Sequence, residues 1–317
     1  MCAAERAPVA RNSIAGRFSC QPSARVTKLL PNAGRDGEPV SYCWPLAPFD
    51  RQHPVRAFFC DPRIGAKGSK AFHFGIDVSG ADGTPVYAVE GGIVDVEGAQ
   101  NIAVVESGGA SEHGYWHIVP AVKPGQQVAQ HELLGHIAKS WGHVHFAERR
   151  GGQYWNPLRK GALTPFADFG APSVDRIVAE RARKHLSPGF LTGVVAFVAE
   201  AHDITPIAAP PPWKGLPVTP AFVRWRLIRG GRAVVPWQVV ADFRTTLLPA
   251  ARYPQVYAAG TTQNHPNAAG LFRFLLARAF DTRRHPDGDY RLDVEAADIR
   301  GNASRKHLEL TFTNAAV

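Results

Sequence analysis

The chain has 317 residues, of which 45% are hydrophobic and 20% charged, and its formal net charge is +9. This composition is that of a globular protein with a core, and it excludes a disordered chain and a collagen-like repeat. No apolar run reaches the roughly 18 residues that a membrane span needs, and a length of about 150 residues per domain predicts two domains. The positive charge favours an anionic partner such as nucleic acid, anionic lipid or an acidic cell-wall polymer.

The first 44 residues show little periodicity, so we expect residues 1–44 to be a loosely ordered lead-in. No signal peptide is recognisable, because this end has no apolar segment. The protein is therefore expected either to stay in the cytoplasm or to have its export segment missing from this chain.

Cysteines occur only in the first fifth of the chain, and none forms a C-x-x-C pair. This spacing argues against a cysteine-based zinc knuckle. One or two disulfides in an oxidising compartment and free buried thiols are both compatible with it, and the pairing is open. The residues concerned are Cys2, Cys20, Cys43 and Cys60.

A first β domain is predicted over residues 45–170, where short apolar runs alternate with Gly and Pro and helical periodicity is nearly absent. Residues 84–96 predict two short strands on either side of Gly91-Gly92. Further strands are expected at 102–106, 122–128 and 144–148. The pattern is that of an antiparallel sheet.

A second β region is predicted over residues 173–317, which makes the whole chain all-β. Its turn chemistry and strand spacing predict a two-sheet sandwich of immunoglobulin or fibronectin type, with Tyr290 as a tyrosine corner. Residues 174–186 fit either a helix or a strand with a long loop. Strands are expected at 193–201, 223–227, 290–296 and 307–313. Side chains assigned to its core are Trp213, Trp225 and Trp237, and those assigned to a solvated face are Arg224 and Arg226.

Three short segments concentrate histidine. His73 and Asp77 are four residues apart, and His143 and His145 are two apart, so in an extended chain each pair points to one side. His117 is expected on a third strand. A catalytic zinc site uses three protein ligands and leaves one position open. Two histidines and one aspartate meet that requirement, and further histidines remain for proton transfer.

These segments carry a family resemblance. The stretches HFGIDVSGADGTPVYAVEGGIV, YWH, VKPGQQV and HVHF, in this order, resemble the lysostaphin-type zinc metallopeptidases of the M23 class. The resemblance covers about residues 44–148. It implies a compact antiparallel sheet crossed by a groove, a Zn²⁺ cofactor, and the peptide stems or cross-bridges of bacterial peptidoglycan as substrate.

The resemblance also implies roles for five residues. His73, Asp77 and His145 match the zinc ligands, and His117 and His143 match the two catalytic histidines. One of these two would be the general base and the other would stabilise the oxyanion, and their assignment is open.

Two segments depart from the family pattern. Lys139-Ser140-Trp141-Gly142 stands where the family has a turn rich in Gly, Ser and Thr, and Gln130-His131-Glu132 stands where it commonly has a glycine turn. Neither segment replaces an expected ligand. We therefore expect the metal site to be kept and the substrate preference to differ.

The leading prediction is a zinc endopeptidase that acts on peptidoglycan in the periplasm, in the cell wall or outside the cell, with a leader missing from this chain. The alternative is a catalytically inactive M23-like protein that binds the wall or activates a hydrolase. The charge of +9 is then explained by an anionic cell-wall polymer. Nucleic acid is not expected as a partner, because no helix-turn-helix, RRM-like or zinc-finger pattern is present.

Overall fold

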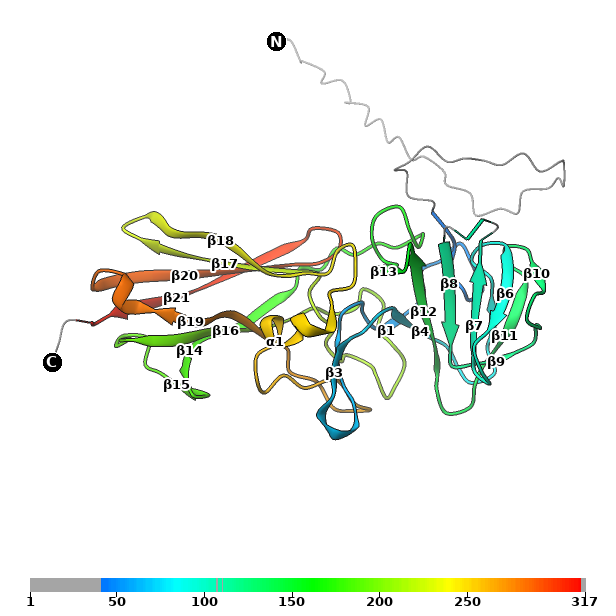
Figure 1. The fold of residues 1–317 in the computed structure, drawn as a ribbon, viewed down its shortest axis with the longest axis horizontal. Coiled ribbons are helices and arrows are strands. Elements are labelled where there is room, and N and C mark those ends of the chain that lie inside the picture. The colour runs from blue at the N-terminus through cyan, green and yellow to red at the C-terminus, as the bar shows by residue number, and fades with distance from the viewer. Residues whose placement is uncertain (1–40, 107, 110, 315–317) are drawn as a thin grey trace, which may run out of the picture.

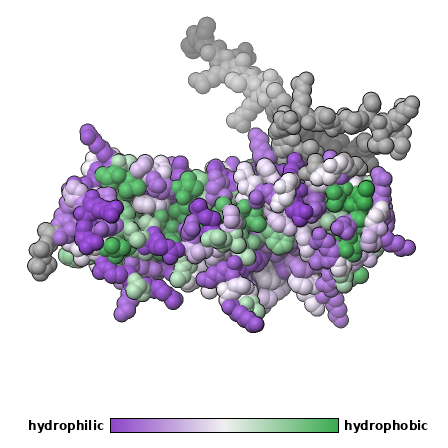
Figure 2. All heavy atoms as spheres, viewed as in Figure 1, coloured by the Kyte–Doolittle hydropathy of each residue, from purple (hydrophilic) through white to green (hydrophobic). Residues whose placement is uncertain are grey.

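The computed structural model describes residues 41–314, apart from 107 and 110. These residues form an elongated molecule built almost wholly of antiparallel strands, with the first β region at one end and the second at the other (Figure 1). None of the helices in this part of the chain has the length and apolar character needed to cross a membrane. In the space-filling view, hydrophilic side chains interrupt the hydrophobic ones along the whole visible face (Figure 2).

The first region contains an eight-stranded sheet in the order β1-β4-β12-β8-β7-β6-β10, with β13 paired to β12. A three-stranded sheet, β5-β11-β9, and the pair β2-β3 complete it. The elements are β1 (Val55–Ala57), β2 (Pro62–Ile64), η1 (Ala66–Gly68), β3 (Lys70–Phe72), β4 (Ile76–Ser79), β5 (Pro85–Tyr87), β6 (Gly92–Val96), β7 (Asn101–Val105), β8 (Ser111–Trp116), β9 (Ile118–Pro120), β10 (Gln127–Val128), β11 (Leu133–Ile137), β12 (His143–Arg150) and β13 (Gln153–Trp155).

The strands predicted at 102–106 and 144–148 are confirmed as β7 and part of β12. Residues 84–96 also form two strands, but β5 and β6 belong to different sheets and do not pair. Gly92 explains part of this arrangement, since a Cβ there would lie 2.3 Å from the Val105 carbonyl oxygen and would prevent the close pairing of β6 with β7. Residues 122–128 contribute only β10.

Part of the expected lead-in belongs to the core. Tyr42 and Trp44 are 1% and 0% exposed, so ordered packing begins before residue 45. Cys43 is disulfide-bonded, whereas Cys60 is a free, buried thiol. Cys2 and Cys20 lie outside the described residues, as does the rest of the expected lead-in.

The second region is a sandwich of two four-stranded antiparallel sheets, β15-β14-β16-β19 and β18-β17-β20-β21 (Figure 1). Phe197 of one sheet meets Trp225 of the other, with ring centroids 6.3 Å apart. The elements are β14 (Ser173–Arg181), β15 (Lys184–His185), β16 (Val194–His202), β17 (Phe222–Arg229), β18 (Arg232–Asp242), η2 (Ala250–Arg252), α1 (Tyr253–Val256), β19 (Arg273–Asp281), η3 (Thr282–Arg284), β20 (Gly288–Ala297) and β21 (Ala303–Phe312).

The second-region strands confirm the predicted β pattern, and residues 174–186 form the hairpin β14-β15 rather than a helix. The Tyr290 hydroxyl donates to the Pro286 carbonyl oxygen at 2.6 Å, the contact that defines a tyrosine corner. The immunoglobulin or fibronectin type of the sandwich stays a prediction.

Two tryptophans predicted in the sandwich core lie elsewhere. Trp225 is buried as predicted, but Trp237 covers the outer face, with its ring 4.5 Å from the Arg224 guanidinium carbon and 4.6 Å from that of Arg226. These arginines are not simply solvated, since they also pair with the buried carboxylates of β20. Trp213 follows three prolines in a loop, where no strand alternation directs it inward, and it reaches the first region instead.

The two regions share one continuous cluster of buried hydrophobic residues. Phe72 of β3 packs against the rings of Phe243, Tyr253 and Tyr257 from the second region, with centroids 5.3 to 5.9 Å apart. The Thr219 backbone N–H donates to Asp61 Oδ1 at 2.8 Å across the same boundary. The second region is therefore packed directly beside the strands that carry the histidines.

Candidate metal centre

The centre of the large sheet places the predicted ligands together. Asp77 on β4 is the register partner of His145 on β12, so these two side chains leave adjacent strands side by side. His73 lies just after β3, and the chain turns at Gly75 before β4 begins. A Cβ on Gly75 would be 2.3 Å from the Phe146 carbonyl oxygen and 2.8 Å from His145 Nε2, so only glycine lets the backbone pass this close to β12.

The three donor atoms converge on one point. His73 Nε2 lies 2.8 Å from His145 Nδ1, and Asp77 Oδ1 lies 3.1 Å from each of these nitrogens. His73 donates through Nδ1 to the Phe58 carbonyl oxygen at 2.8 Å, which leaves the lone pair of Nε2 for this point. All three side chains are less than 10% exposed.

The second oxygen of Asp77 faces two arginines that the sequence analysis did not single out. Arg63 Nη2 donates to Asp77 Oδ2 at 3.1 Å, and Arg56 Nε lies 3.9 Å from the same oxygen. Both arginines come from short strands that fold back over the site, so only the tertiary structure reveals them. No spacing or motif in the sequence marked them.

His143 is held at both ring nitrogens. Its Nδ1 donates to the Trp141 carbonyl oxygen at 2.8 Å, so Nε2 of the neutral ring accepts from Arg56 Nη2 at 3.3 Å. The same nitrogen is 3.5 Å from Asp77 Oδ1. His143 therefore borders the converging donor atoms in a fixed tautomer.

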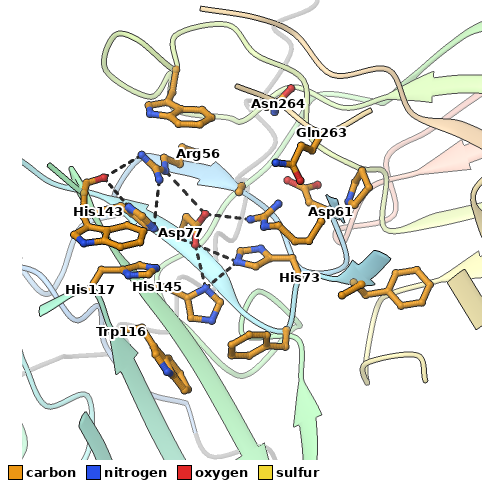
Figure 3. A pocket seen from close by; sticks show the side chains of 18 of the residues that line it. Arg56, Asp61, His73, Asp77, Trp116, His117, His143, His145, Gln263 and Asn264 are labelled. Atoms are coloured by element: carbon orange, nitrogen blue, oxygen red, sulfur yellow. Dashed lines mark hydrogen bonds and ion pairs between the residues drawn. The ribbon is translucent and has the colours of Figure 1, made fainter. Parts of the chain in front are cut away.

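His117 was expected on a strand, and this expectation is wrong. It lies between β8 and β9 with a φ of 68°, a left-handed conformation that non-glycine residues seldom adopt outside special sites. Its ring stacks on Trp141 at 3.5 Å and is 4.7 Å from the His143 ring. The conformation turns the imidazole towards the other histidines (Figure 3).

A cavity of about 400 Å³ opens over these residues, and both regions line it (Figure 3). The first region contributes the five predicted residues together with Arg56 and Arg63. The second region contributes four residues from its loops, the last of them directly before β19. These are Trp213, Gln263, Asn264 and Phe272.

Burial determines the protonation of the histidines. It lowers the pKa of His73 to about 3, the pKa of His117 to about 3 and the pKa of His143 to about 4. All three rings are neutral at pH 7, the state that a metal-binding or proton-accepting imidazole needs. Burial acts to raise the pKa of Asp77, but its contacts with the surrounding histidines outweigh burial and hold this pKa well below its ordinary value.

The donor set fits a zinc ion. Zinc ligands at about 2.0 to 2.2 Å in a tetrahedral arrangement lie about 3.3 Å from one another, close to the separations of His73, Asp77 and His145. The buried His145 Nε2 has no hydrogen-bond partner among the described residues, so hydrogen bonding alone does not account for the position of this ring. The structure thus brings together all five residues that the sequence singled out.

The chain is similar to known peptidases. Residues 71–157 match the model of peptidase family M23, and no curated protein matches the chain. The catalytic domain of the antimicrobial peptidase lysostaphin from Staphylococcus simulans is 22% identical over 33% of this chain and 90% of its own, with a TM-score of 0.30. A zinc-containing peptidase from Vibrio cholerae is 20% identical over 38% of this chain and 40% of its own, with a TM-score of 0.33.

These structural scores are low, so the assignment comes from the family match, which confirms the resemblance expected from the sequence. The match lies entirely within the first region and includes His73, Asp77, His117, His143 and His145. The chain therefore carries a domain of peptidase family M23.

Proposed function

We propose that the protein is a zinc-dependent endopeptidase that cleaves peptide bonds in bacterial peptidoglycan. The observation that carries this proposal is the convergence of His73 Nε2, His145 Nδ1 and Asp77 Oδ1 within 3.1 Å of one another beside an open cavity. These three residues would hold the zinc. A zinc ion there supplies a Lewis acid for the scissile carbonyl and lowers the pKa of a water molecule to about 7.

The two remaining histidines take different roles in this proposal. Both nitrogens of His143 already have partners, namely the Trp141 carbonyl and Arg56. The His117 ring makes no hydrogen bond to any described residue, and it faces the cavity. His117 is therefore the group that accepts a proton from water and returns it to the leaving amine. His143 carries no proton on Nε2 in this tautomer and holds the Arg56 guanidinium, which stabilises the negative charge that develops on the carbonyl oxygen.

Two further properties of the chain support a site of action outside the cytoplasm, where peptidoglycan lies. The first is the disulfide bond of Cys43, because disulfides persist in oxidising compartments. The net charge of +9 suits retention by an anionic wall polymer. Salt-dependent binding of the protein to isolated walls would support this partner.

The test is digestion of purified peptidoglycan by the chelated protein before and after one equivalent of zinc is restored. We expect release of soluble peptides only with zinc, and none from His145→Ala. His136→Ala is the matched control, because this histidine is exposed on β11 and should retain activity. Wall binding by wild-type protein with no release of peptide would instead support the non-catalytic alternative and refute the enzyme.

A further inference from the structure

Two arginines line the cavity beside the three proposed zinc ligands (the triad). Arg56 and Arg63 both face Asp77 Oδ2, so two guanidinium groups share one carboxylate oxygen. The other acidic residue of the cavity, Asp61, accepts two backbone N–H groups. In the described part of the chain no ion pair joins Asp61 to either arginine, so the two guanidinium groups share the single carboxylate of Asp77 and favour an anionic group of a ligand here.

The two arginines differ in how many of their N–H donors remain available to a ligand. Arg56 donates to the Trp141 carbonyl and to His143, and Trp213 covers its guanidinium face at 4.2 Å. Arg63 uses one of its five N–H groups on Asp77, and its side chain is 34% exposed. Arg63 is thus the arginine with donors available to the cavity.

Gln263 supplies a second donor from the other region. Its Oε1 accepts from the Ile64 backbone N–H at 2.5 Å, and Ile64 follows Arg63 in β2. This bond fixes the side chain next to Arg63, and both residues line the cavity. The amide nitrogen of Gln263 makes no hydrogen bond to any described residue and remains as a donor on the cavity side (Figure 3).

We propose that Arg63 and Gln263 bind a carboxylate of the substrate, within two residues of the scissile bond. This inference rests on the proposed function, because it assumes that a peptide occupies the cavity. The planar fork of arginine matches a carboxylate with two parallel hydrogen bonds. Arg63 contacts Asp77 Oδ2, and the other oxygen of this carboxylate, Oδ1, belongs to the triad. One or two substrate residues of about 3.3 to 3.6 Å each therefore span the distance from Arg63 to the reacting carbonyl.

A carboxylate at this place has two sources, a C-terminal α-carboxylate and an acidic side chain. Three probes separate them: N-acetyl-alanyl-alanine, its C-terminal amide, and N-acetyl-glutamyl-alanine amide. The full chain is titrated with each probe with zinc and after chelation, so that binding of the carboxylate to the metal is separated from binding to the protein. Tryptophan fluorescence reports binding, because Trp116, Trp141 and Trp213 line the cavity.

We expect one of the two acids to bind the chelated protein on the order of 10- to 100-fold more tightly than the neutral amide. Gln263→Glu keeps the acceptor for the Ile64 N–H but replaces the free donor with a negative oxygen. This variant should lose most of the preference and bind the amide as before. The matched control is Gln52→Glu, since Gln52 Oε1 accepts from the Ala167 N–H at 2.7 Å away from the cavity, and it should retain the preference.

Equal affinity for the acids and the amide, no binding of any probe, or a preference unchanged in Gln263→Glu would each overturn the inference. Because these titrations need no bond cleavage, their failure is distinct from failure of the proposed function. A protein that digests peptidoglycan yet shows no preference would keep the function and refute the carboxylate site.

Discussion

The indole of Trp141 stacks on the imidazole of His117, with ring centroids 3.5 Å apart and the two planes inclined by 13°. The Trp141 carbonyl oxygen also accepts from His143 Nδ1 and from Arg56 Nη1. One residue thus fixes three groups around the cavity. Trp141 lies in the turn that departs from the family pattern, and it contacts both candidate catalytic histidines.

Trp141→Ala should lower kcat/KM on the order of 10-fold, because a stacked aromatic pair contributes about 0.5 to 1.5 kcal/mol and holds the His117 ring. The backbone contacts of Trp141 and the zinc content should not change. Peptide release and metal analysis on one preparation test both statements. Trp237→Ala, on the far face of the sandwich, serves as the control. Undiminished turnover in Trp141→Ala would show that the stack does not position His117.

Gly75→Ala should weaken zinc binding by at least about 10-fold, since the added Cβ would meet the Phe146 carbonyl at 2.3 Å and the His145 ring at 2.8 Å. Competition with a chromogenic chelator measures the affinity. Gly189→Ala is the matched control, because a Cβ there meets nothing within 4 Å. If Gly75→Ala binds zinc as tightly as Gly189→Ala and the wild type, glycine is not required for the approach of β4 to β12.

Glu148→Ala should lower the free energy of unfolding by about 3 to 5 kcal/mol. Glu148 is 0% exposed, and its carboxylate accepts from Tyr42 at 2.6 Å and from Arg159 at 2.5 and 2.7 Å, so its removal leaves a buried guanidinium unpaired. Urea unfolding measures the loss. Asp242→Ala removes a partly exposed carboxylate from Arg244 and should cost less than about 1 kcal/mol. Equal losses in the two variants would contradict this reasoning.

Asp203→Asn should stabilise the protein increasingly as the pH rises from about 4 to about 8. Burial, together with Asp168 and Asp298, raises the pKa of Asp203 from 3.8 to about 8. In that pH window the unfolded chain is ionised while the folded chain keeps its proton, so the wild type loses stability as the pH rises, by at most about 1.4 kcal/mol per pH unit.

The asparagine variant keeps the Oδ1 acceptor for the Ile204 N–H and removes Oδ2, which has no hydrogen-bond partner among the described residues. Thermal melts of both proteins at pH 4 to 9 test the prediction. The difference between them should grow up to about pH 8 and then level off. A constant difference would show that Asp203 is ionised in the folded state.

Much of the candidate site could be predicted because its residues lie in short motifs. His143 and His145 are two residues apart on β12, and strand alternation brings them to one side. His73 and Asp77 are also close in sequence, but the turn at Gly75 between β3 and β4, rather than strand alternation, brings them together. Arg56, Arg63 and Gln263 could not be found this way. Arg56 and Arg63 meet Asp77, and Gln263 meets the backbone of β2, through contacts between different segments of the chain. Local periodicity does not encode such contacts.

The fold shows the same limit. Alternation predicted strands such as β20, whose Tyr290, Leu292 and Val294 are buried. Alternation could not show that Trp213 lies over Arg56, because loop residues have no face fixed by a period. The sequence pattern predicted a solvated face at Arg224 and Arg226. In the structure these two arginines cover the buried carboxylates of β20, and Trp237 packs on the arginines.

The central claim is that the site formed by His73, Asp77 and His145 hydrolyses peptidoglycan peptides. Mass analysis of the fragments released from purified peptidoglycan by the zinc-loaded wild type and by His145→Ala tests it most directly. The account predicts fragments from the wild type that carry one added water at a single type of peptide bond, and none from the variant. Identical fragments from both proteins, or none from the zinc-loaded wild type, would contradict it.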